Sequence, residues 1–191
     1  MSVVEPLRER LVSAGVDMLE QVGAEQLGLR AIAREAGVSH GAPRRWFPTH
    51  NALLAAIAAR GYLDLGARLE AVQGDTPRAR IENSCLTYVG FAAQRPEMFA
   101  LMFRHDLLEG AGENLRATIT LPMFRRWRDL VAAGLTAGST TSADELALGL
   151  WTNLHGIASV VANRSIEAIA PGTDIPRLVA QAIARHLPES R

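Results

Sequence analysis

The sequence has no lysine: all 20 of its basic residues are arginine, and 20 acidic residues balance them to a net charge of zero. A chain without excess charge does not bind polyanions through its overall charge. Any contact with nucleic acid therefore has to come from a local concentration of arginine. The absence of lysine, together with abundant alanine and glycine, also indicates a GC-rich bacterial genome.

Cysteine and long apolar runs are scarce as well. The single cysteine, Cys85, excludes an intrachain disulfide and a cysteine-based zinc cluster, and we expect it to pack as a small apolar group in a reducing compartment. The most apolar segment, 146–162, is interrupted by Thr152, Asn153 and His155, so no membrane span is expected. The N-terminal residues also lack a signal-peptide pattern, and the expected location is the cytoplasm.

The sequence lacks the common motifs of catalysis and of cofactor binding. It has no G-x-S-x-G elbow, no glycine-rich nucleotide loop and no H-E-x-x-H run. His105, Asp106 and Glu109 lie within about one helical turn, but adjacent side chains on a helix diverge by about 100°, so they do not converge on a metal ion. We therefore expect no enzyme activity, no cofactor and no metal site.

No segment alternates polar and apolar residues with a period of two, and no internal repeat is present, so the expected fold class is all-α. The predicted organisation is an N-terminal three-helix unit over residues 1–48, a connecting helix over 49–73 and a C-terminal antiparallel helical bundle over 74–191. About nine helices are expected: 6–22, 29–36, 39–47, 50–72, 77–94, 96–108, 113–137, 143–164 and 175–187.

Sequence signals mark where several of these helices begin. Thr49 and Thr76 are suitable N-caps, and Ser142 with Glu145 has the form of a capping box. Pro122 interrupts the 113–137 helix and is expected to kink it. The 143–164 helix is apolar on nearly every side, which predicts that one side meets its own core and the opposite side a second subunit.

The stretch 29–47 reads as two short helices joined by a tight turn. Apolar residues at three- and four-residue steps share one face of the first helix, and Gly37 supplies the turn because it tolerates a left-handed backbone. Ser39 is a good N-cap for the second helix, and Pro43 falls in its first turn. Arg44 and Arg45 follow, which is the layout of a helix-turn-helix that places its second helix in a DNA major groove.

The charge of this stretch differs from that of the whole chain. Between positions 29 and 50 the only acidic residue is Glu35, against four arginines (Arg30, Arg34, Arg44 and Arg45), which leaves a local net charge of +3. The sequence therefore predicts that this stretch provides the local cationic surface that nucleic-acid binding needs.

The first 60 residues resemble the DNA-binding domain of TetR/AcrR-type transcriptional regulators. LRAIAREAGVS is similar to that family's second helix and turn, and HGAPRRWFPTHNALLAAIA to its recognition helix and the start of its fourth helix. The chain has Arg44 where the family often has a phosphate-contacting tyrosine. It has His50 and Asn51 where the family usually has a lysine and a glutamate.

Motif and resemblance together predict a set of DNA-contacting residues. Arg44 and Arg45 are predicted to form bidentate hydrogen bonds with guanine or to pair with phosphate. Arg30, at the start of the 29–36 helix, is predicted to face a phosphate together with the backbone amides there. Ser39 is predicted to cap its helix, to contact phosphate, or both, while Trp46 is predicted to belong to the core rather than to the DNA-reading surface. The predicted contacts are Arg30, Ser39, His40, Gly41, Arg44, Arg45 and His50.

The C-terminal half carries a second resemblance. Trp151, His155 and Gly156 read W-x-x-x-H-G, which is similar to the motif of the WHG-type ligand-binding domain of some TetR-type regulators. Aromatic residues and methionines at helical spacing form a core in the first place, yet pockets in helical bundles have the same composition with a few polar groups. For His155 the alternative is a buried histidine bonded to a backbone carbonyl. The predicted ligand-lining residues are Tyr88, Phe103, Trp127, Trp151 and His155.

The resemblance implies a homodimeric transcriptional regulator. Two-fold symmetry would place two recognition helices in successive major grooves of double-stranded DNA, about 34–36 Å apart on a pseudo-palindromic operator. A small-molecule effector, of unknown identity, would bind in the C-terminal domain and release a repressor from DNA. Helices 143–164 and 175–187 would form the dimer interface. The alternative is a small-molecule-binding or scaffold protein with a vestigial DNA-binding head.

Overall fold

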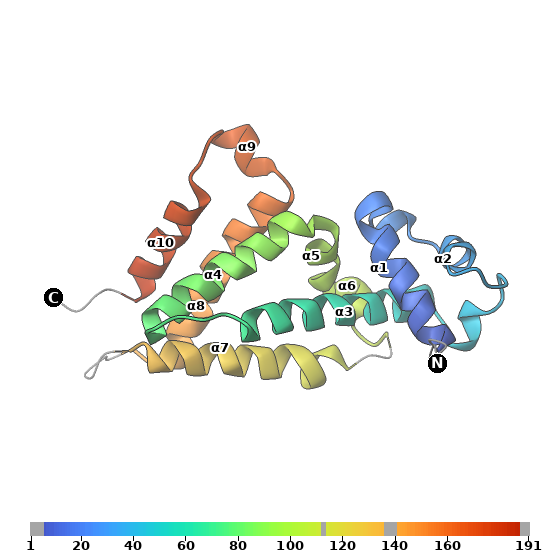
Figure 1. The fold of residues 1–191 in the computed structure, drawn as a ribbon, viewed down its shortest axis with the longest axis horizontal. Coiled ribbons are helices and arrows are strands. Elements are labelled where there is room, and N and C mark those ends of the chain that lie inside the picture. Colours follow the sequence, from blue (N-terminus) through green and yellow to red (C-terminus); the bar gives the residue numbers. More distant parts are fainter. Residues whose placement is uncertain (1–5, 112–113, 136–140, 188–191) are drawn as a thin grey trace. The chain divides into compact units, whose positions relative to one another are not determined.

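The computed structural model describes residues 6–111, 114–135 and 141–187. Within these residues it contains ten α-helices, one 3₁₀ helix and one π-helical turn, and no strand (Figure 1), so the expected all-α class is confirmed. By its internal contacts the chain divides into two compact units. Unit 1 comprises Met1–Leu63 and Glu97–Arg116, and unit 2 comprises Asp64–Pro96 and Ala117–Arg191.

Unit 1 contains the predicted helix-turn-helix together with two short helices from later in the chain. Its elements are α1 (Leu7–Gln26), α2 (Leu29–Glu35), the 3₁₀ helix Pro43–Arg45, the first two thirds of α3 (His50–Glu70), most of α5 (Pro96–Met102) and α6 (His105–Leu108).

The core of unit 1 depends on close helix packing. Gly15 of α1 lies so near Ile57 of α3 that an added Cβ would overlap the Ile57 side chain. Gly23 breaks the helical geometry near the end of α1, with φ +71° and ψ 162°, a backbone conformation that favours glycine. The last residues of α1 thereby turn towards α2.

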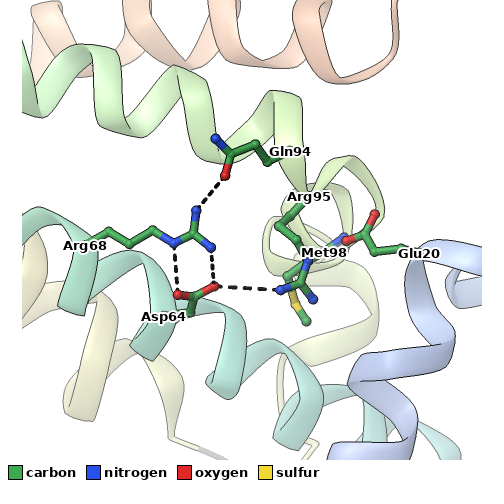
Figure 2. Close-up of polar contacts among 6 residues, drawn as sticks. All are labelled: Glu20, Asp64, Arg68, Gln94, Arg95 and Met98. Carbon is green, nitrogen blue, oxygen red and sulfur yellow. Dashed lines mark hydrogen bonds and ion pairs between the residues drawn. The ribbon is translucent and has the colours of Figure 1, made fainter.

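The later helices of unit 1 are held by polar contacts to α1 and α3. The Tyr62 hydroxyl on α3 donates to the carbonyl of Met102. Glu20 on α1 accepts hydrogen bonds from the backbone amides of Glu97 and Met98, both at 3.1 Å. Figure 2 shows Glu20 beside Met98. This carboxylate acts as a cap for the first turn of α5, whose amides have no partner inside the helix.

Unit 2 is a helical bundle in which α8 packs against α4, α7, α9 and α10 (Figure 1). Its elements are the end of α3, α4 (Pro77–Gln94), the π turn Arg116–Thr120 with α7 (Leu121–Ala133), α8 (Ala143–Ala162), α9 (Ser165–Ile169) and α10 (Ile175–His186). Leu148 on the outer face of α8 is 51% exposed, so the helix is buried on only part of its circumference in the single chain.

A network of side chains holds α3 to α4 within unit 2. Arg68 on α3 donates from Nε and Nη2 to the two carboxylate oxygens of Asp64, at 2.9 and 3.1 Å, and from Nη1 to Gln94 on α4 at 2.9 Å (Figure 2). Arg95 reaches the same carboxylate at 3.8 Å. The C-terminal end of α4 is therefore tied to the connecting helix by charge-assisted bonds.

Three of the predicted helix starts are confirmed by their caps. Thr49 and Thr76 accept hydrogen bonds from the amides three residues on, at 3.0 and 3.1 Å. Ser142 and Glu145 form the reciprocal capping box at the start of α8.

Two of the helices predicted after residue 95 were wrong in extent. The 96–108 helix stops at Met102 and resumes as α6, because Arg104 has a non-helical backbone with ψ +68°. The predicted 113–137 helix is described by the structure over residues 114–135, and within this part Pro122 does not kink a continuous helix. It occupies the first turn of α7, where its missing N–H is tolerated, and the preceding residues form a π-helical turn. The helix α9 was not predicted.

Cys85 is buried on α4, as its predicted role as a small apolar group requires. Burial is the main cause that raises the pKa of its thiol to about 12, and the nearby Glu82 carboxylate adds to it. The thiol therefore stays protonated at neutral pH.

Candidate nucleic-acid interface and ligand site

The turn after α2 has the geometry of a Schellman motif. Gly37 adopts φ +66°, the amide of Val38 donates to the Ala33 carbonyl at 2.9 Å, and the amide of Gly37 donates to the Arg34 carbonyl at 3.1 Å. These bonds give partners to two of the last carbonyls of α2. The predicted glycine turn is therefore present, and it sets the direction in which the chain leaves α2.

Arg10 on α1 secures the same helix end. Its Nη2 donates to the Ala36 carbonyl at 2.5 Å. A cation at a helix C-terminus interacts favourably with the partial negative charge there. The turn is thus attached to α1 and does not depend on local bonds alone.

The predicted recognition helix 39–47 is much shorter in the structure. The amide of Ala42 bonds to the Ser39 carbonyl at 3.0 Å in a tight turn, and only Pro43–Arg45 form a 3₁₀ helix, whose N-cap is Ala42 and not Ser39. The physical reason lies in two residues. Pro43 has no N–H to donate to the Ser39 carbonyl, and Gly41 is a poor helix former.

Alternation of buried and exposed side chains orients this short element. Pro43 and Phe47 are buried, and the amide of Phe47 donates to the Pro43 carbonyl at 2.8 Å. The three residues between them, Arg44, Arg45 and Trp46, are exposed. Trp46 is 49% exposed, so its predicted place in the core was wrong.

Six of the seven predicted DNA contacts lie exposed on unit 1. The guanidinium groups of Arg30, Arg44 and Arg45, and that of the neighbouring Arg34, have no ion pair or side-chain hydrogen bond within the described residues. Their positive charge is therefore not compensated by the protein itself. The exposed residues are Arg30, Ser39, His40, Gly41, Arg44 and Arg45.

His50 differs from the other six. Its ring is half-buried at the start of α3, and Nε2 donates to the carbonyl of Leu27 at 2.6 Å. The bond ties the loop after α1 to the connecting helix. With Nε2 engaged in this way, the predicted phosphate contact of His50 would have to come from Nδ1 or from a rearranged ring.

Three of the predicted ligand-lining residues come together between α4 and α8. The hydroxyl of Tyr88 and Nδ1 of His155 share a hydrogen bond of 2.9 Å. The indole of Trp151 stacks on the imidazole of His155 with ring centroids 5.5 Å apart. Desolvation by burial lowers the pKa of His155 from its ordinary value, so the ring is neutral at pH 7. The bond from Nδ1 of His155 is thus to a side chain.

Two aromatic residues on α7 border this cluster. Phe124 meets Trp151 edge-on, with centroids 6.3 Å apart, and Nε1 of Trp127 donates to the Ala147 carbonyl of α8 at 2.9 Å. Phe124 was not among the predicted lining residues. The spacing of Phe124 and Trp127, three residues apart on one helix face, was the signal that could have identified it.

Phe103 belongs to unit 1, where its ring packs against Phe99 and Tyr62 with centroids 5.0 and 6.0 Å apart. The 96–108 helix breaks after Met102, and Phe103 follows that break. The cluster around His155 belongs to unit 2, and the predicted contact of Phe103 with a ligand stays a prediction.

An open groove of about 540 Å³ lies on unit 2, between the end of α3 and α4. None of the predicted ligand-lining residues borders it. Two of its polar side chains already have protein partners, because Arg68 is paired with Asp64 and the Asn83 amide donates to the Gln73 carbonyl. The groove is lined by Arg68, Ala71, Val72, Gln73, Asn83, Leu86 and Thr87.

Neither a metal cluster nor a membrane span is found in the part of the chain that the structure describes. No three histidine, cysteine, aspartate or glutamate side chains are grouped so as to hold an ion there. No helix in that part combines the length and the apolar composition that crossing a bilayer requires.

Two family models match the sequence. Residues 11–57 match the family described as "Bacterial regulatory proteins, tetR family". Residues 81–186 match "Tetracyclin repressor-like, C-terminal domain". The second match covers α8 with its W-x-x-x-H-G residues, and the narrower WHG-type assignment stays a prediction.

A curated relative and two solved structures are similar to the chain. "HTH-type transcriptional regulator Rv1816" of Mycobacterium tuberculosis is 25% identical over 148 residues, or 75% of this chain, and the aligned part spans only 63% of the relative's length. A protein of unknown function from Rhodococcus sp. RHA1 is 31% identical with a TM-score of 0.80, covering 96% of this chain and 95% of that one. BioQ, solved with its double-stranded DNA operator, is 17% identical with a TM-score of 0.65 over 95% and 98% of the two chains, and shares the fold.

Proposed function

The chain belongs to the tetR family of bacterial regulatory proteins, and we propose that it acts as a DNA-binding transcriptional repressor that a small-molecule effector releases from its operator. The DNA-binding part is residues 1–48, the connecting helix is 49–73, and residues 74–191 bind the effector and dimerise.

The observation that carries this proposal is the exposed arginine surface of unit 1. Arg30, Arg34, Arg44 and Arg45 carry charges that no acidic side chain of the described residues neutralises. Their supporting backbone is held by the Schellman turn and by Arg10. A rigid cationic surface of this kind releases counterions when it meets DNA phosphates, which supplies affinity. Arg44 and Arg45 also have the donor geometry to read guanine.

Dimerisation doubles the number of bases read. One protomer presents a single short element to DNA, so a two-fold pair on a pseudo-palindromic operator provides the specificity that one copy lacks. We assign the dimer interface to α8 and α10. The exposed face of α8 carries Leu148, Thr152 and Gly156, and an added Cβ at Gly156 would meet open space in the single chain. Such a face lets a second helix approach closely and buries apolar surface.

The effector site is assigned to the cluster of Tyr88, Trp151 and His155, with Trp127 at its border. It combines stacked aromatic faces with a neutral polar pair, which is the composition of small-molecule sites in helical bundles. The effector has to bind the DNA-free conformation more tightly than the DNA-bound one. About 1–3 kcal/mol of such coupling is enough for regulation.

The test removes two arginines from the DNA-binding surface. Arg44→Ala with Arg45→Ala is compared with Arg80→Ala with Arg125→Ala, a control that deletes the same charge from two exposed positions of unit 2. Each protein is titrated by fluorescence anisotropy against a duplex that the parent selects from a random-sequence pool. The first pair should bind more weakly, and the dependence of log K on log salt should flatten by about 0.9 for each phosphate that the variant no longer neutralises.

The control pair should bind as the parent does. An equally large decrease in affinity in both pairs would mean that the surface of unit 1 is not the DNA-binding surface. A parent that selects no duplex would favour the alternative of a small-molecule-binding or scaffold protein with a vestigial DNA-binding head.

A further inference from the structure

Trp46 is the largest side chain on the arginine surface of unit 1, and it lies in the open. It is 49% exposed, directly after Arg44 and Arg45 and before the buried Phe47. Within the described residues its ring has no aromatic or cation contact and its Nε1–H has no hydrogen-bond acceptor. A tryptophan this exposed is unusual, since such residues are highly buried on average.

The other two tryptophans of the chain show the contrast. Trp127 donates its N–H to a backbone carbonyl, and Trp151 is flanked by Phe124 and His155. Both indoles are therefore engaged by partners inside the protein. Trp46 has no such partner among the described residues, and it follows directly after two exposed arginines.

The backbone places Phe47 on the inner side of this element and Trp46 on the outer side. The Pro43 carbonyl accepts hydrogen bonds from the amides of both Trp46 and Phe47, at 3.0 and 2.8 Å. Phe47 fills the inner position with 2% exposure, and the guanidinium of Arg8 covers its ring at 5.4 Å. The core position that the sequence suggested for Trp46 is thus occupied by its neighbour. Trp46 shares its exposed stretch with Arg44 and Arg45, because all three lie between the two buried residues.

We propose that Trp46 is a further DNA-contacting residue, which lays its indole on deoxyribose and thymine methyl groups at the edge of the groove that Arg44 and Arg45 enter. The Nε1–H donates to a phosphate oxygen. This inference rests on the proposed function. Its chemistry fits double-stranded DNA, because a duplex offers apolar sugar and methyl surface within a few ångströms of phosphate acceptors. It also explains why an apolar side chain interrupts a cationic surface.

A neutral contact and a charged contact differ in how they respond to salt. Removing an arginine–phosphate pair lowers the salt dependence of log K, whereas removing an indole contact lowers affinity at every salt concentration without changing the slope. The contribution of Trp46 can therefore be separated from that of Arg44 by titration alone.

The experiment compares Trp46→Ala, Trp46→Phe and Leu63→Ala on the selected duplex. Leu63 provides the matched control, since it is a large apolar residue of unit 1 with 56% exposure. Trp46→Ala should bind about 5- to 150-fold more weakly, the range for one good contact, with an unchanged salt slope. Trp46→Phe should fall in between, because it keeps an aromatic ring and lacks the donor. Leu63→Ala should bind as the parent does.

A second measurement does not depend on Trp46→Ala folding well. In Trp46→Phe, an aromatic ring keeps the position filled, so the tryptophan emission of the parent should be quenched and shifted when the duplex is added, while that of Trp46→Phe should not. Unchanged emission, or parent-like affinity of Trp46→Ala, would overturn the inference while leaving the proposed function intact. A parent without any DNA binding would instead overturn the proposed function.

Discussion

Gly61 on α3 is a point where one added methyl group should lower the stability of unit 1. A Cβ at this position would lie 2.5 Å from Sδ and 2.7 Å from Cγ of Met98, and 2.9 Å from Sδ of Met102. Carbon contacts are favourable at about 3.5–4.0 Å, so α5 would have to move by about 1 Å. Met98 and Met102 are 1% and 0% exposed, which leaves no free space for them to move into.

The size of the effect follows from two opposing contributions. Overpacking a well-packed core costs about 1–3 kcal/mol, while replacing glycine by alanine inside a helix gains about 1 kcal/mol. Gly61→Ala should therefore lower the free energy of unfolding by about 0–2 kcal/mol. Gly66→Ala, five residues along the same helix, should raise it by about 1 kcal/mol, because its Cβ would meet only Cε of Met123 at 3.4 Å.

The difference between the two variants isolates the packing cost, since the helix-propensity gain is common to both. Thermal unfolding followed by far-ultraviolet circular dichroism measures it. A difference of about 1–3 kcal/mol corresponds to melting temperatures about 2–12 °C apart for a chain of this length. If Gly61→Ala proved as stable as Gly66→Ala, α5 would not approach α3 as closely as the structure places it, and the reasoning would fail.

Two further predictions concern polar groups. Glu20→Ala removes the acceptor of the Glu97 and Met98 amides and should lower the free energy of unfolding, measured by urea denaturation, by about 1–2 kcal/mol. The control Asp17→Asn changes an exposed acid on the same helix and should alter the free energy of unfolding by less than about 0.5 kcal/mol. Equal decreases in the two variants would contradict the capping role of Glu20. Burial lowers the pKa of His155 in the folded protein, so the unfolded chain takes up a proton at a higher pH than the folded one. The free energy of unfolding should therefore rise with pH in the window below the ordinary pKa value of 6.5. His155→Gln should lack this part of the pH dependence, measured as unfolding free energies from about pH 5 to 7, and an unchanged profile would refute the assignment.

The sequence predicted structure correctly where hydrogen bonds between neighbouring residues determine it. The caps at Thr49, Thr76 and Ser142 and the turn at Gly37 were predicted and are present, because each depends on residues within about four positions of one another. The membership of the first 60 residues in a known family was visible for the same reason.

Several features could not be predicted because they depend on residues distant in sequence. The contact of the Phe103 ring with the Tyr62 ring joins α3 to a residue about 40 positions later in the chain. The bond of His50 to the Leu27 carbonyl spans 23 residues. A periodicity argument identifies which residues are apolar, but it does not say which of two adjacent aromatic residues enters the core.

The sequence by itself determined the all-α class, the helix starts at Thr49, Thr76 and Ser142, the family and the cationic character of the 29–50 stretch, since propensity, capping and charge are local properties. Only the tertiary structure decided that the recognition element is a 3₁₀ turn, that Phe47 and not Trp46 fills the core, and that Tyr88 meets His155 across two helices. Those outcomes depend on which of two side chains occupies the same buried space and on partners far along the chain. Both are decided only when the helices pack against one another.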